Sequence, residues 1–289
     1  MTSLADRADA AKSLVTRLRE RHAPFDLLMS VIDKGGRDGI GRLSAVVTYF
    51  AFFSIFPLLL LLVSVAAMVL DKDRRKQVTD MAISNFPMLG DKISLTKLEG
   101  RSVTVIIAGI AALWSGTHAF DALEHAIHAV SHAAFDQPLG FLKRRLRALA
   151  LLGVLGTGLV ITTVLGSVVA EADLPGPVRP LGFIVTAVAN VVLLGVMYAV
   201  AIPGRDTWRR LAPGAIVGGI GLTLIHALGG WFLSRVTKAS AAYGFFGTVL
   251  GLLTWIKLIV TVVLWSAELN TVLVDRATVA ADGQVIDGS

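Results

Sequence analysis

The sequence predicts an all-α membrane protein, built as a bundle of six transmembrane helices. Hydrophobic residues make up 54% of the 289 residues and charged residues only 17%, and the mean hydropathy is +0.70. Soluble domains carry about 25% charged residues. Several stretches without Asp, Glu, Lys or Arg reach the roughly 20 residues that a helix needs to cross hydrocarbon. These observations favour a polytopic membrane protein with no separate soluble domain.

The elements follow from this pattern in chain order. Residues 1–42 are polar and of mixed charge, so we expect no signal peptide there but an amphipathic helix on the cytoplasmic interface. Short external amphipathic helices are expected between the first two spans. The domain covers 43–275, and 276–289 form a cytoplasmic tail. The six spans are predicted at about 43–70, 102–132, 146–171, 180–203, 209–235 and 243–272.

If the N-terminus is cytoplasmic, the segments on the cytoplasmic side contain more Lys and Arg than the segments on the external side. By the positive-inside rule, both termini are predicted to be cytoplasmic. The basic residues stand at helix ends with little aromatic interleaving, so the net charge of +6 indicates attraction to anionic phospholipid rather than to nucleic acid. The absence of cysteine excludes disulfides and thiolate ligands.

The segment "HAFDALEHAIHAVSH" (118–132) holds four of the six histidines of the chain. At 100° per residue its ionisable side chains fall within roughly a 120° arc of one helix. This stripe admits three interpretations: metal ligation, a titratable proton relay, or the polar rim of the membrane domain. We prefer the rim, because the span that begins near Ser102 reaches the boundary near Asp121. The stripe consists of His118, Asp121, Glu124, His125, His128 and His132.

Charged residues inside a predicted span are costly and are functional candidates. Lys257 and Glu268 of the last span lie within about 20° of the same helix face but some 16 Å apart along the axis, so they cannot pair directly. We take both as candidates for a polar pathway, and we add Asn190 and His226 from other spans.

A basic group follows the stripe and opens the third span. Positive-inside anchoring is one interpretation, and a headgroup-phosphate site is another, because arginine binds phosphate oxygens bidentately. Both can hold together. The group consists of Lys143, Arg144, Arg145 and Arg147.

Small residues at GxxxG spacing, in "GAIVG" (214–218) and "GTVLG" (247–251), predict close helix packing. Pro57 is expected to kink the first span.

Four blocks in order resemble the YihY/BrkB family of bacterial inner-membrane proteins, and the chain looks most similar to its YhjD branch. They are "SAVVTYFAFFSIFPLLLLLVS" (44–64), "LWSGTHAFDAL" (113–123), "MYAVAIPGRDTWRRLAPGAIVGG" (197–219) and "YGFFGTVLGLLTWIKLIVTVVLWSAELN" (243–270). The resemblance implies a six-helix protein of the bacterial inner membrane that supports envelope integrity. Members of this family have also carried the label ribonuclease BN.

We therefore predict a transporter-like protein that handles a lipid or another anionic amphiphile. The alternative is a non-transporting envelope scaffold that binds lipid or partner proteins. A hydrolase is less favoured, because the soluble segments contain no spaced carboxylate or His-Asp motif. We expect no catalytic residues, no cofactor and no resident metal. Anionic phospholipid is the expected partner, with further copies of the chain as a second option.

Overall fold

The computed structural model describes residues 23–69, 102–131, 179–202, 207–229, 231–232, 234–235 and 245–286, with isolated residues between 146 and 158. Regular structure in these ranges is helical, which confirms the all-α class for them. The helices are α2 (Ala23–Asp38), α3 (Ile40–Val69), α6 (Ser102–Ser131), α8 (Arg179–Ala201), α9 (Thr207–Ala227) and α11 (Phe245–Ile286).

Four of the described helices contain a segment long and apolar enough to cross a membrane, namely Ile40–Leu58, Gly182–Ala201, Trp208–Ala227 and Phe246–Val279. They correspond to the first, fourth, fifth and sixth predicted spans. The second predicted span is the continuous helix α6. The third span lies outside the described residues apart from isolated positions, as do the external helices of 71–101 and residues 1–22. The number of six spans therefore stays a prediction.

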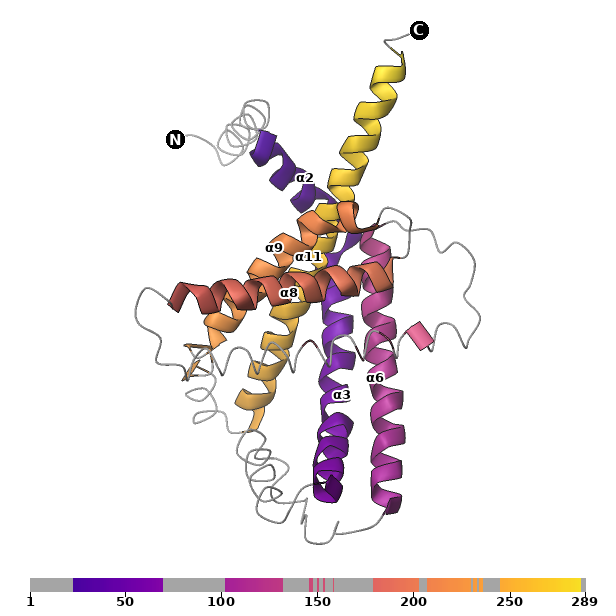
Figure 1. Cartoon of the computed structure of the whole chain (residues 1–289), viewed down its shortest axis with the longest axis vertical. Helices are drawn as coiled ribbons and strands as arrows, with labels where there is room; N and C mark the ends of the chain where they lie inside the picture. The colour runs from indigo at the N-terminus through magenta and orange to yellow at the C-terminus, as the bar shows by residue number, and fades with distance from the viewer. Residues whose placement is uncertain are drawn as a thin grey trace, which may run out of the picture.

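Helix α11 is central, because α2, α3, α6 and α9 all pack against it. Figure 1 shows α3 and α6 side by side along the long axis of the molecule, and these two helices pack on each other. Helix α8 packs on α9 and crosses the direction of α3 and α6 steeply in the same view. The described helices therefore do not all run nearly parallel, as the helices of a simple up-and-down bundle do.

Close packing between α9 and α11 depends on the predicted GxxxG motif. A Cβ atom added to Gly214 would lie 2.1 Å from the carbonyl oxygen of Ser266, and one added to Gly218 would lie 2.5 Å from the Oγ atom of the same residue. Only glycine lets the two backbones approach this closely. The packing interpretation of this motif is therefore confirmed.

The core is formed by side chains of α3, α6, α8, α9 and α11. These side chains are apolar, apart from one tyrosine whose hydroxyl is hydrogen-bonded. The largest fully buried members are Ile40, Ile127, Val130, Leu194, Met197, Tyr198 and Leu264.

A one-residue turn joins α2 to α3. Gly39 has a φ angle of 71°, a left-handed conformation that glycine adopts without steric cost. Its carbonyl oxygen accepts hydrogen bonds from the N–H groups of Arg42 (2.8 Å) and Leu43 (3.1 Å). This turn lets α2 leave the axis of α3 and pack on α11, where Gly35 faces the ring of Trp265.

Helix α11 is longer than the predicted sixth span. It continues to Ile286, through most of the segment that we expect to be a tail, and its last part extends beyond the other labelled helices in Figure 1. Arg276 ties this extension to α2 through an ion pair with Asp26.

Candidate functional site

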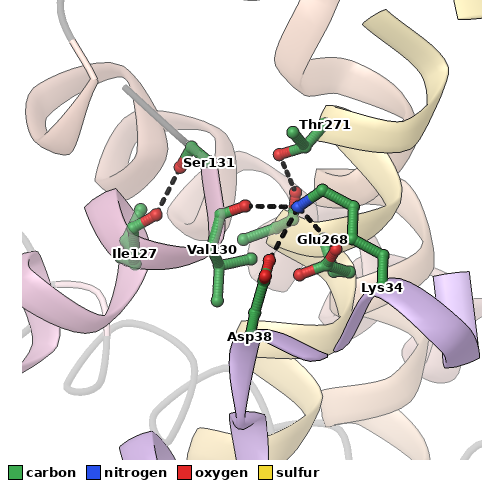
Figure 2. A network of polar contacts seen from close by, with 8 residues as sticks. Lys34, Asp38, Ile127, Val130, Ser131, Glu268 and Thr271 are labelled. Carbon is green, nitrogen blue, oxygen red and sulfur yellow. Dashed lines mark hydrogen bonds and ion pairs between the residues drawn. The ribbon is translucent and has the colours of Figure 1, made fainter. Parts of the chain in front are cut away.

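A buried ion cluster joins α2, α6 and α11 (Figure 2). The Nζ atom of Lys34 lies 2.7 Å from Oε1 of Glu268 and 2.8 Å from Oδ2 of Asp38, and it donates a hydrogen bond of 2.9 Å to the carbonyl oxygen of Val130. The side chain of Lys34 is 9% exposed and that of Glu268 is 0% exposed. Two carboxylates and one carbonyl thus surround one ammonium group in the protein interior.

The sequence positions each partner for this cluster. Lys34 and Asp38 are one helical turn apart on α2 and therefore share a face. Val130 stands in the last turn of α6, where carbonyl oxygens lack partners within the helix and attract cations. An ammonium group has three donors and finds three acceptors here, which is what allows its burial.

A second ion pair joins α2 to α11 about two helical turns from this cluster, toward the N-terminus of α2 and the C-terminus of α11. Arg276 lies 2.6 Å from Oδ2 of Asp26, and its guanidinium also contacts the hydroxyl of Ser30 at 2.7 Å. Both charged side chains are more than one third exposed, at 38% and 37%. This pair is therefore screened by solvent and contributes little to stability.

A basic cavity of about 440 Å³ opens between α2 and α11 beside these ion pairs. Three of its lining residues are basic and one, Asp275, is acidic. Arg37 is exposed. The lining is Ser30, Lys34, Arg37, Val272, Asp275, Arg276 and Val279.

A second cavity, of about 540 Å³, lies between α2, α9 and α11, and its lining is almost entirely apolar. Leu28 and Val31 line it from α2, Val217 from α9, and Val262 and Leu269 from α11. The two cavities occupy neighbouring faces of the same helix pair, α2 and α11.

The segment "SAELN" (266–270) of α11 makes polar contacts with α8 and α9. Ser266 accepts or donates a hydrogen bond of 2.6 Å with the hydroxyl of Tyr198 on α8. The side chain of Asn270 accepts from the N–H of Gly214 (2.6 Å) and donates to the carbonyl of Leu211 (3.1 Å). These two groups flank Pro213 of α9, so one amide of α11 binds the backbone of α9 on both sides of the proline.

The predicted pathway residues do not come together. Glu268 is fully buried in the ion cluster, whereas Lys257 is exposed on α11 and lines neither of the two cavities. Asn190 is buried and donates a hydrogen bond of 3.0 Å to Thr223 across the α8–α9 contact. His226 is exposed.

The stripe and the basic group meet at one point. Arg147 lies 2.9 Å from Oε1 of Glu124, and His128 lies 3.7 Å from the same oxygen. Glu124 and His128 are buried, and Arg147 is half-buried. One residue of each predicted set therefore contributes to a single ion pair between α6 and the segment that follows it.

The other described members of the stripe are less buried than Glu124 and His128. His118 and Asp121 are half-buried, and His125 is exposed. The ring of His118 contacts the carbonyl of Trp114 at 2.7 Å through Nδ1. In the described ranges no group of three or more His, Asp or Glu side chains is placed to hold a metal ion. His132, Lys143, Arg144 and Arg145 lie outside the described residues.

Lys34 is the site residue that sequence reasoning misses. It lies in a polar segment, where a lysine is expected to be exposed to solvent. A signal is nevertheless present in "KGGRD" (34–38), where Lys and Asp at i, i+4 flank two glycines, and small residues of this kind mark close helix contacts. The carboxylate of Glu268 inside an apolar helix is the complementary signal, because a buried acid requires a partner.

Comparison with known proteins identifies relatives of this chain. The model of the family described as "Virulence factor BrkB" matches residues 31–285. A ribonuclease-like protein, YfkH, of Bacillus subtilis (strain 168) is 24% identical over 249 residues, which cover 81% of this chain and 90% of that protein. No solved structure matches. The family match spans α2 beyond its first turns and every later described helix, and the chain belongs to the BrkB family.

Proposed function

We propose that this membrane protein binds and translocates an anionic amphiphile of the bacterial inner membrane, and that it does so without catalysing a reaction. The observation that carries the proposal is the basic cavity between α2 and α11, with Arg37, Arg276 and the hydroxyl of Ser30 in its lining. Guanidinium groups bind phosphate and carboxylate oxygens in bidentate geometry. Both termini are proposed to lie on the cytoplasmic side.

The exposed ion pair makes the cavity available to a ligand. Because Arg276 and Asp26 are more than one third exposed, their pairing is worth at most about 1 kcal/mol. A phosphate or carboxylate headgroup can therefore replace the carboxylate of Asp26 at little cost. Lys34, by contrast, already has three acceptors and holds the wall of the cavity in place.

The test compares three variants in vesicles of phosphatidylethanolamine and phosphatidylglycerol. Arg37→Gln combined with Arg276→Gln should abolish the preference for phosphatidylglycerol, measured as bound lipid by native mass spectrometry. Asp26→Asn breaks the same ion pair but keeps the guanidinium, so binding should be retained or increased. Arg210→Gln removes an exposed arginine of α9 that does not line the cavity, and it should have no effect. An unchanged lipid preference in the double variant would contradict the proposal.

The second candidate is an envelope scaffold that binds lipid without transporting it. The closed ion cluster favours this alternative, because Glu268 is bound by Lys34 instead of lining an open path. Transfer of a fluorescent anionic lipid across proteoliposomes separates the two functions. Selective binding without transfer supports the scaffold, and binding with transfer supports translocation.

A further inference from the structure

The apolar cavity between α2, α9 and α11 plays no part in the headgroup site, and its walls restrict what can occupy it. Among its lining residues, polar side-chain groups come only from Trp265 and Ser266. The hydroxyl of Ser266 is already engaged with Tyr198 and with the carbonyl of Val263 (2.9 Å). A polar ligand would find almost no hydrogen-bonding partner there.

An extended polypeptide segment is a poor occupant for the same reason. Each residue of such a segment would bring an N–H and a C=O group without partners of its own, and the walls offer too few partners for them. A hydrocarbon chain has no such groups, so it can occupy the cavity without this penalty.

The position of the cavity indicates the source of the hydrocarbon chain that would fill it. Its α9 and α11 walls fall within the segments Trp208–Ala227 and Phe246–Val279, both apolar enough to cross a membrane. Leu28 on the α2 wall is 55% exposed and Val217 on the α9 wall is 53% exposed, so the lining still presents apolar surface. Membrane lipid is the source of hydrocarbon at this depth.

We infer that this cavity binds one acyl chain of a membrane amphiphile, and that the headgroup of the same molecule lies at the adjacent basic cavity. A volume of about 540 Å³ is within the range of sites for a single small ligand. Ser30 and Lys34 line the basic cavity while Val31 lines the apolar one, so α2 separates head from chain. The negative charge of the headgroup is taken from the proposed function, so this part of the inference rests on that proposal. The acyl-chain site itself rests only on the apolar walls of the cavity.

The test uses two photoreactive probes in vesicles of phosphatidylethanolamine and phosphatidylglycerol: a fatty acid and an uncharged fatty alcohol, each with a diazirine near the chain end. Both should label the α11 peptide that contains Val262 and Leu269. Val217→Trp fills the cavity from α9 and should remove most of this label. Ile216→Trp is the matched control, because Ile216 is exposed to a similar extent (48%) but does not line the cavity. In this variant the α11 peptide should still be labelled.

Equal labelling of the two variants, or no label on that peptide with either probe, would overturn the chain site. If Val217→Trp does not fold, Leu28→Trp fills the same cavity from α2 and decides the question. The two probes separate this inference from the proposed function. Labelling by both probes without preference for the acid keeps the chain site and contradicts the anionic headgroup, whereas lipid selectivity without labelling contradicts only the chain site.

Discussion

Replacement of Lys34 by methionine tests the buried ion cluster most directly. The change keeps a long side chain but removes the ammonium that contacts Glu268, Asp38 and the carbonyl of Val130. Removing one partner of a buried ion pair costs about 3–5 kcal/mol, because the other charge stays buried without compensation. At roughly 2–4 °C per kcal/mol for a chain of this size class, the Tm should fall by about 6–20 °C.

A double-mutant cycle separates the ion pair from general damage. Glu268→Gln alone should cost less than Lys34→Met, because Lys34 keeps two of its three acceptors. The double variant Lys34→Met with Glu268→Gln should be more stable than Lys34→Met alone, since no uncompensated carboxylate remains at position 268. Thermal denaturation of all four proteins in the same lipid vesicles measures the coupling free energy.

Lys257→Met is the matched control for this cycle. It makes the same chemical change on α11, but Lys257 is exposed, so the Tm should not fall. The reasoning is refuted if Lys34→Met is as stable as the unmodified protein, or if the losses in the two single variants simply add in the double variant.

Three further predictions have defined outcomes. Asn270→Leu removes the two buried hydrogen bonds by which α11 binds the backbone of α9, at about 0.5–1.5 kcal/mol each, and a Tm within 1 °C of the unmodified protein would contradict this account. Gly218→Ala places a Cβ atom against a neighbouring side chain and should lower the Tm, whereas Gly36→Ala, whose Cβ meets nothing within 4 Å, should be neutral or raise it. Arg147→Gln should lower the Tm by removing the ion partner of Glu124, and adding Glu124→Gln should restore part of the loss, which the same melting curves will show.

Much of the architecture follows from local features of the sequence. Apolar stretches of sufficient length locate α3, α8, α9 and the first part of α11, because the cost of placing charges in hydrocarbon is a property of composition along the chain. The GxxxG spacing at 214–218 correctly predicts close packing, since two glycines four residues apart lie on one helix face. The presence of Glu268 in an apolar helix also shows that a partner must exist.

The identity of that partner is decided only by the tertiary structure. Lys34 and Glu268 come from opposite ends of the chain, and an ion pair between distant segments leaves no periodic pattern in the sequence. The same holds for Asn270, which binds the backbone of α9 beside Pro213, and for the pairing of Arg147 with Glu124. The two cavities exist because the turn at Gly39 directs α2 onto α11, so the candidate site depends on how whole helices pack and not on any one motif.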